Sequence, residues 1–290
     1  MNVKLKLLAI FLLMIIISCN SFSNKIVENS WVQDNLRGKV KNFEEVSSDV
    51  TQLKGRTEKK LFFNEYNEKG YAIEKRDFRL RNKKVFKYDN KGNRVQRLVY
   101  SLNDNGSGPM DKMISEYDDD GNLVTTKWSN SYSQGKWMYK YDENGNQIEF
   151  IEHHRGKVYK RTIYKYNEKG EIIQETLYNT DNLLVERAIF DYDKNGNKIL
   201  INMFAPDERI RFRSAYKYDD RNNRIEEINF LKFGDDKADL EYAIANDLDK
   251  YKEHFTYAYE YDNEGNWVKK TKYNNGEVVF ISEREYTYYE

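Results

Sequence analysis

One short motif recurs along this chain of 290 residues and constrains its fold more than any other feature. It consists of tyrosine, aspartate or asparagine, two variable residues, glycine and usually asparagine. Successive motif tyrosines are 22, 29, 24, 25, 26, 26 and 43 residues apart, and repeats of about 20–50 residues are typical of arrays of small structural units. The eight copies begin at Tyr66, Tyr88, Tyr117, Tyr141, Tyr166, Tyr192, Tyr218 and Tyr261.

The residues of the motif predict a tight turn between two β-strands. An Asp or Asn side chain at the first turn position can accept hydrogen bonds from backbone N–H groups two residues further on. The glycine can adopt the left-handed conformation of a G1 bulge, which reverses the chain into a hairpin. In the seventh copy Asn222 replaces this glycine, and asparagine tolerates a positive φ better than most residues do.

Alternating aromatic residues before the turn indicate that the flanking segments are strands. Tyr139 and Tyr141 are two residues apart, as are Tyr164 and Tyr166, and this spacing places each pair on one face of a strand. A second, more variable turn, such as Arg155-Gly156-Lys157, then returns the chain. Each unit is therefore expected to contain two antiparallel strands of about 6–8 residues.

The motif, with an apolar and an aromatic residue downstream of it, resembles the repeats of the YD-repeat (Rhs-repeat) family. The resemblance covers the chain from about Leu61 to its end. In large Rhs toxins such repeats wind into a shell around a toxic domain. The resemblance implies a repeat architecture, and sugar binding is the usual suggestion for short secreted members of the family.

Hairpins joined in sequence predict an all-β protein, a long antiparallel meander of about 16–18 strands. A sheet of this length must twist, curl or close. Hydrophobic residues make up only 39% of the chain even with its 24 tyrosines included, which argues against two thick faces packed as a sandwich. We expect one curled sheet or an open barrel-like spiral with a tyrosine-rich face, and we expect residues 38–46 to form the first strand and cap the sheet edge.

The seventh repeat carries an insertion at about residues 232–254. Within it, apolar residues recur at helical spacing, and Asp235 or Asp236 can serve as an N-cap. A short helix is therefore predicted near residues 236–250. Packing on the sheet is favoured over recognition as its role, because apolar helix stripes usually serve packing. The residues at helical spacing are Leu240, Ile244, Leu248 and Tyr251.

The amino-terminal residues predict an exported lipoprotein. Lys4 and Lys6 precede an apolar run at 7–17, which is shorter than the about 20 residues of a membrane-spanning helix but matches a signal-peptide core. The following Ile16-Ile17-Ser18-Cys19 resembles the bacterial lipobox. The resemblance implies cleavage before Cys19 and diacylglycerol on its sulfur. The alternative is an ordinary signal peptide that happens to contain a cysteine.

This interpretation divides the chain into a signal peptide at 1–18, a lipidated cysteine and tether at 19–37, and a repeat domain at 38–290. Cys19 is the only cysteine, so the fold cannot depend on an intramolecular disulfide. Residue 20 is Asn rather than Asp. By analogy with Gram-negative lipoproteins, this favours the outer membrane within the cell envelope.

Composition and motifs argue against nucleic-acid binding, metal binding and catalysis. Lys plus Arg and Asp plus Glu number 48 each, whereas nucleic-acid binders show a basic excess. Of the three histidines, His153 and His154 are adjacent and would point to opposite faces of a strand, so no metal site is expected. No catalytic or cofactor-binding motif is recognisable. We expect neither a cofactor nor an enzymatic activity.

The remaining prediction is a binding module on the cell envelope, with a glycan as its candidate ligand. Carbohydrate sites often use exposed aromatic platforms, although cross-strand packing is the more common role of such residues in sheets. The alternative is a scaffold that binds envelope proteins, or an immunity partner of an Rhs-type toxin. A weaker alternative is a cell-wall hydrolase, which a pair of buried carboxylates in a cleft would favour. The candidate ligand-binding aromatics are Trp128, Tyr132, Trp137 and Trp267.

Overall fold

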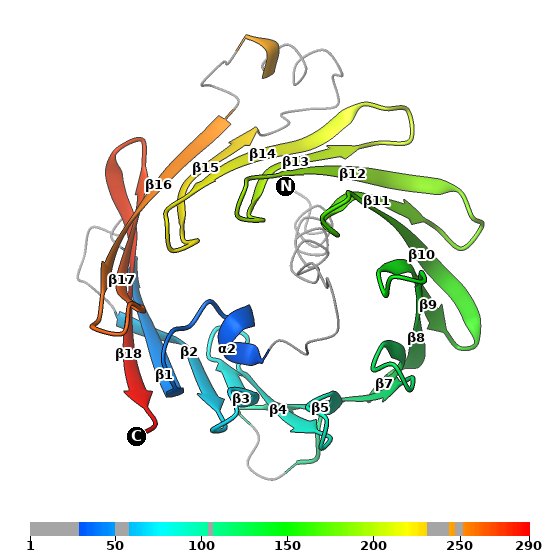
Figure 1. Ribbon diagram of the computed structural model, residues 1–290, viewed down its shortest axis with the longest axis horizontal. Helices are drawn as coiled ribbons and strands as arrows, with labels where there is room; N and C mark the ends of the chain where they lie inside the picture. The colour runs from blue at the N-terminus through cyan, green and yellow to red at the C-terminus, as the bar shows by residue number, and fades with distance from the viewer. Residues whose placement is uncertain (1–28, 50–57, 104–106, 231–243, 247–251) are drawn as a thin grey trace.

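Eighteen antiparallel strands form one closed barrel. The computed structural model describes residues 29–49, 58–103, 107–230, 244–246 and 252–290. Each strand pairs with its neighbours in sequence, and β1 (Val40–Asp49) pairs with both β2 (Glu58–Tyr66) and β18 (Glu277–Tyr288). The strands therefore form a complete ring (Figure 1).

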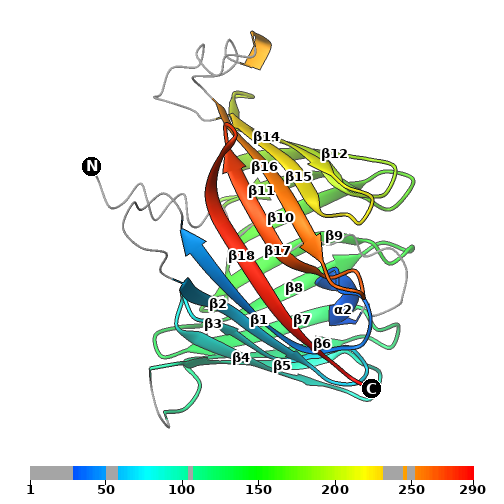
Figure 2. The ribbon, with the colours of Figure 1, turned by 90° about the vertical axis from the view of Figure 1, so that its left-hand side faces the viewer.

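The other strands form the predicted succession of hairpins and run obliquely along the wall of the barrel (Figure 2). They are β3 (Ala72–Asp77), β4 (Asn82–Tyr88), β5 (Arg94–Ser101), β6 (Asp111–Tyr117), β7 (Leu123–Asn130), β8 (Gln134–Tyr141), β9 (Gln147–His154), β10 (Lys157–Tyr166), β11 (Ile172–Tyr178), β12 (Leu184–Tyr192), β13 (Lys198–Phe204), β14 (Ile210–Tyr218), β15 (Arg224–Phe230), β16 (Lys252–Tyr261) and β17 (Trp267–Asn274).

The all-β meander of hairpin repeats is confirmed, and the sheet closes instead of remaining an open spiral. The strand expected at residues 38–46 is β1, which joins both edges of the sheet instead of capping one. Its register runs from Val40 opposite Tyr288 to Asp49 opposite Phe280. Closure removes the unpaired strand edges that would otherwise be free to pair with other chains.

The motif turns have the predicted geometry. In the second copy Asp89 Oδ1 accepts hydrogen bonds from the backbone N–H groups of Lys91 (2.9 Å) and Asn93 (2.8 Å). The Asn93 side chain donates to Asp89 Oδ2 at 3.0 Å, and Gly92 has a φ of +90°. In the seventh copy Asn222 takes the glycine position with a φ of +62°. At the fourth copy, the hydrogen bond from Asn146 holds the pKa of the Asp142 carboxyl below its usual value.

The motif tyrosines connect each repeat to the one before it. The Tyr141 hydroxyl donates to the carbonyl of Leu123 at 2.9 Å, and Leu123 lies six residues after the preceding motif tyrosine, Tyr117. Eight hydrogen bonds of this kind, 2.7–3.1 Å long, form a tyrosine ladder around the barrel; six come from motif tyrosines, and Tyr259 and Tyr286 donate the other two. They join Tyr88 to Ala72, Tyr117 to Arg94, Tyr141 to Leu123, Tyr166 to Gln147, Tyr192 to Ile172, Tyr218 to Lys198, Tyr259 to Arg224 and Tyr286 to Trp267.

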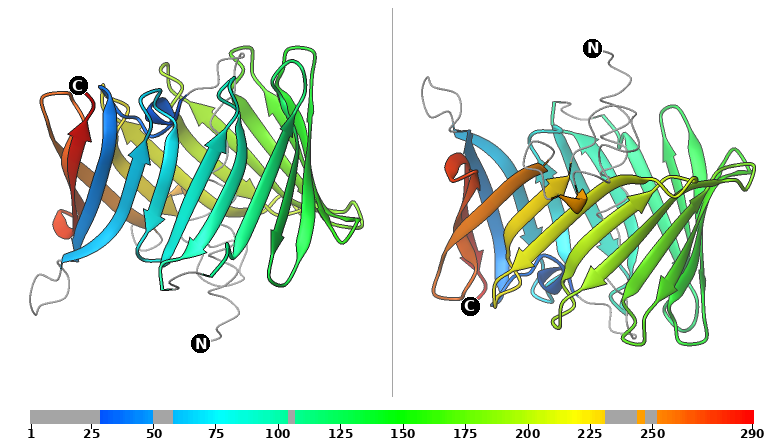
Figure 3. Two further views of the ribbon diagram at one scale, coloured as in Figure 1. Left: turned by 90° about the horizontal axis from the view of Figure 1, so that it is seen from below. Right: turned by 90° about the horizontal axis from the view of Figure 1, so that it is seen from above.

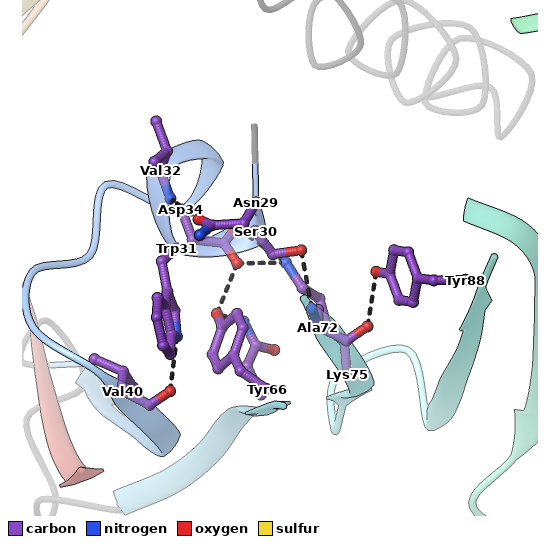
Figure 4. A network of polar contacts seen from close by, with 11 residues as sticks. Asn29, Ser30, Trp31, Val32, Asp34, Val40, Tyr66, Ala72, Lys75 and Tyr88 are labelled. Carbon is purple, nitrogen blue, oxygen red and sulfur yellow. Dashed lines mark hydrogen bonds and ion pairs between the residues drawn. The ribbon is translucent and has the colours of Figure 1, made fainter. Parts of the chain in front are cut away.

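The tyrosine-rich face points into the barrel, where a short helix, α2 (Ser30–Gln33), lies against it. Asp34 accepts hydrogen bonds from the Tyr66 hydroxyl (2.6 Å) and from Lys75 Nζ (2.7 Å) (Figure 4). The Trp31 indole donates to the Val40 carbonyl at 2.7 Å. These contacts identify the inner face, and α2 lies at the same end of the barrel as the C terminus (Figure 3).

Tyrosines fill much of the interior and stay neutral there. Tyr66 is fully buried and packs with Phe43 and Phe86 in one cluster, while Phe190 and Ile201 belong to a second cluster on β12 and β13. Burial raises the pKa of Tyr117 to about 12. A neutral phenol can donate a hydrogen bond and still bury its ring.

The outer face carries charged side chains in cross-strand pairs. Alternation along β8 turns Lys136 and Lys140 outward, because Trp137, Tyr139 and Tyr141 face inward. Similar outward pairs recur around the wall, so charged groups are distributed over the outer face. They include Lys140 with Glu149 (2.5 Å), Lys217 with Glu226 (2.5 Å), Lys127 with Glu116 (2.7 Å) and Lys269 with Glu260 (2.7 Å).

Two predictions fall mainly outside the described residues. The signal peptide and Cys19 precede residue 29, and the helix expected near residues 236–250 is described only at 244–246. Within the described ranges, no helix has the length and apolarity needed to span a membrane.

We expect the tyrosine ladder to contribute measurably to stability. Tyr141→Phe removes the hydroxyl that donates to Leu123 and keeps the ring, so it should lower the free energy of unfolding by about 0.5–1.5 kcal/mol in urea titrations. Tyr132→Phe is the matched control, because the Tyr132 side chain is 93% exposed, and it should leave stability unchanged. Equal stability of both variants and the wild type would show that the ladder bond contributes nothing.

Candidate functional site

A cavity of about 680 Å³ opens on the outer wall formed by β6 to β9. The strand register explains which residues meet there. Ile114 is opposite Lys127, Lys127 is opposite Lys136, and Lys136 is opposite His153. These four side chains form one row across four strands, and all of them line the cavity.

The neighbouring rows complete the cavity with apolar and polar groups. Met138 lies on one side of the row, while Ser129 and Gln134, which face each other, lie on the other. Ile114 and Met138 are half-buried and supply an apolar floor. Because the lining side chains stand mainly on paired strands, their positions are fixed more firmly than they would be on loops.

The charge of the lining is positive. Lys112, Lys127, Lys136 and Arg155 contribute four cations, and the lining residues include no Asp or Glu. Lys127 contacts Glu116 just outside the cavity at 2.7 Å. The Nδ1 atom of His153 is buried and has no hydrogen-bond partner among the described residues.

Trp128, one of the predicted aromatics, also borders the cavity, although strand alternation turns its indole to the inner face, opposite to its neighbour Lys127. Its backbone partner across the hairpin is Gly135. A Cβ atom on Gly135 would lie 2.5 Å from Trp128 Cζ2 and would clash with the carbonyl oxygen of His153. Glycine therefore allows the indole to lie over the neighbouring strand, where it meets the ring of His154 at a centroid distance of 4.9 Å.

The structure brings three of the four predicted aromatics onto one hairpin. Trp128 and Trp137 lie on β7 and β8, and Tyr132 lies in the turn between them. Trp137 packs against Phe150, with ring centroids 6.1 Å apart. The indole nitrogens of Trp128 and Trp137 are buried without a hydrogen-bond partner in the described part of the chain.

Tyr132 is the most open of the four aromatics. Its turn is held by Asn130, whose side-chain oxygen accepts hydrogen bonds from the backbone N–H groups of Tyr132 and Ser133, both at 2.9 Å. The turn leaves the Tyr132 side chain 93% exposed. It can therefore contact a ligand without any rearrangement of the wall.

Trp267 lies on β17, on the opposite side of the ring from β7 and β8 (Figure 1). The guanidinium of Arg284 lies 3.8 Å from its ring centroid, and Tyr259 packs at 6.3 Å. Trp267 therefore packs against residues of neighbouring strands and is not among the residues that line the cavity.

The sequence analysis did not single out the basic side chains of the cavity, because they appear there as ordinary dispersed surface charge. The hairpin between β7 and β8 does indicate that two of them are neighbours. Lys127 and Lys136 are equally distant from the midpoint of the 131–132 turn, so a hairpin centred there must place them opposite each other. The contribution of Lys112 and Arg155 depends on two further strand pairings, which the motif alone does not fix.

Metal binding finds no support in the geometry of the described residues. Within those ranges, no three His, Cys, Asp or Glu side chains gather closely enough to hold a metal ion.

Comparisons with known proteins give distant structural likeness. No protein-family model and no curated protein matches the chain. A porin-like protein from Bacteroides uniformis is similar over 86% of this chain and 97% of that chain, with 11% identity and a TM-score of 0.45. A porin-like protein from Bacteroides vulgatus is similar over 86% and 99%, with 14% identity and a TM-score of 0.36.

A third likeness is to the TcdB2-TccC3-TEV structure. It covers 79% of this chain with 15% identity and a TM-score of 0.33, and this chain spans only 13% of that one. The YD-repeat assignment therefore stays a resemblance carried by the motif.

Proposed function

We propose that this protein is a non-catalytic binding barrel of the bacterial cell envelope, anchored through Cys19, and that it binds carbohydrate in the cavity on β6 to β9. The observation that carries the proposal is the cavity itself. It combines an apolar floor with polar side chains that stand on paired strands.

Its lining suits the mixed chemistry of a sugar. Pyranose rings present apolar C–H faces and hydroxyl edges. Ile114 and Met138 can contact the faces, and Ser129 and Gln134 can exchange hydrogen bonds with the edges. Tyr132 extends from the same hairpin and provides an aromatic surface for a further sugar unit.

A non-catalytic role is supported by the acidic residues. Hydrolysis of a glycan ordinarily requires two carboxyl groups that flank the scissile bond, and the cavity lining includes none. Two of the buried glutamates elsewhere in the described chain contact cations closely. Glu45 meets Arg284 at 2.9 Å, and Glu149 meets Lys140 at 2.5 Å.

A barrel wall that lies in water, as anchoring through a lipid requires, is supported by the outer face. In barrels that span membranes the outward face is apolar, and Lys or Arg at mid-membrane depth costs about 2–4 kcal/mol. Here lysines point outward along the wall and pair with glutamates, as at Lys217 and Lys269. Such a wall is stable in water.

An oligosaccharide array followed by titration calorimetry tests carbohydrate binding. The delipidated protein should bind at least one bacterial envelope glycan, and Ser129→Ala with Gln134→Ala should weaken that binding about tenfold. The control is Thr256→Ala with Thr271→Ala, which changes outward polar residues on β16 and β17 and should have no effect. An array without hits, or equal loss in both variants, would contradict the proposal.

Fractionation of bacterial cells that express the full chain tests the anchor. The wild type should sediment with membranes, and Cys19→Ala should move most of the protein to the soluble fraction, because its thiol is the predicted site of acylation. Equal membrane association of the two proteins would rule out lipid anchoring at Cys19.

A further inference from the structure

We infer that the ligand of the β6–β9 cavity is an anionic carbohydrate, one that carries carboxylate or phosphate groups. This inference rests on the proposed function and narrows its ligand class. It is carried by the arrangement of four cations around one cavity: Lys112 on β6, Lys127 on β7, Lys136 on β8, and Arg155 in the turn after β9.

The register places like charges directly opposite each other. Lys127 faces Lys136 across the hairpin. Like charges in directly opposed positions of an antiparallel pair are destabilising. The wall thus concentrates positive charge here at a cost in stability, which a bound anion would offset.

At other positions on the same wall, outward cations contact glutamates. Arg76 and Lys83 also face each other, but both contact Glu74, at 2.5 and 3.8 Å. The outward lysines at 140 and 217 each contact a glutamate on the neighbouring strand at 2.5 Å. Among the described residues, the four cations of the cavity make one such contact, between Lys127 and Glu116.

The chemistry of the cations fits oxyanions. Lysine provides a mobile point charge, and the planar guanidinium of Arg155 can bind a carboxylate or phosphate through two parallel hydrogen bonds. His153 adds a buried nitrogen, Nδ1, that has no hydrogen-bond partner among the described residues. Because Ile114 and Met138 form the floor, the ligand must also present an apolar surface, as a sugar ring does and a free inorganic anion does not.

The test compares two ligands that differ in charge and share one sugar backbone. Oligogalacturonate and its methyl ester are titrated against the delipidated protein by calorimetry. The acidic form should bind at least about tenfold more tightly than the ester, and its affinity should fall as salt is raised from low to physiological concentration.

Charge-neutralising variants locate the site. Lys112→Gln with Lys136→Gln should weaken oligogalacturonate binding at least about tenfold. The matched control is Lys217→Gln with Lys269→Gln, which removes two outward lysines on β14 and β17 and should change affinity less than about twofold. Thermal melts verify folding, and Lys136→Gln should raise the melting temperature slightly because it relieves repulsion from Lys127.

The outcomes separate this inference from the proposed function. Binding of the acidic and esterified forms with equal affinity, unaffected by the Lys112 and Lys136 substitutions, would overturn the anionic assignment and leave carbohydrate binding intact. Failure of every glycan to bind would overturn both. Equal affinity for single-stranded DNA of the same charge would overturn the assignment to carbohydrate, because the site would then bind polyanions without regard to the sugar.

Discussion

The hydrogen bond that a tyrosine at the start of a motif turn, or close to it, donates to the backbone of the preceding repeat is the interaction on which the rest of the structure depends. It recurs at the same offset, so that Tyr166 meets Gln147 and Tyr192 meets Ile172, both at 2.7 Å. The donor tyrosine lies beside the bulge that precedes the motif turn. At this bulge the regular backbone hydrogen bonds between the two strands are interrupted. The tyrosine supplies an extra link between repeats close to an irregularity in the β-pairing.

Because of this hydrogen bond, the inner and outer faces of the barrel have different roles. Tyrosine rings fill the inside with apolar surface while their hydroxyls remain bonded, which allows a chain poor in aliphatic residues to close around its own side chains. The outer face then needs less apolar packing, which there includes Arg213 over the ring of Phe230. It carries ion pairs and the cationic cavity on β6 to β9, so binding chemistry can vary there with little effect on the fold.

The sequence predicted the repeating elements well, because their signals are local. The Asp-to-Gly turns, the positive φ at Asn222 and the tyrosine-rich face all follow from a few adjacent residues. Closure did not follow, because the contact between β1 and β18 joins Val40 to Tyr288, and no local pattern encodes a pairing across the whole chain.

The candidate site was predicted only in part, for the same reason. Aromatic composition pointed to the β7–β8 hairpin, and Trp128 and Tyr132 do lie there. The cations come from four consecutive segments, so Lys112 and Arg155 become neighbours only when the register of three strand pairings is known. Trp267 is the opposite case. It was predicted as a ligand-binding aromatic from its residue type, and the structure packs it against Arg284 instead.

A disulfide between β1 and β18 tests most directly whether the repeats close into a ring. Ser47 and Ser282 are opposed across this seam and are both buried, and the Cα separation of opposed antiparallel residues, about 4.5–5.5 Å, suits a disulfide. In a Cys19→Ser background, Ser47→Cys with Ser282→Cys should cross-link fully under mild oxidation, as read by mass spectrometry. Two thiols that remain free to react with an alkylating reagent would contradict closure and favour an open spiral.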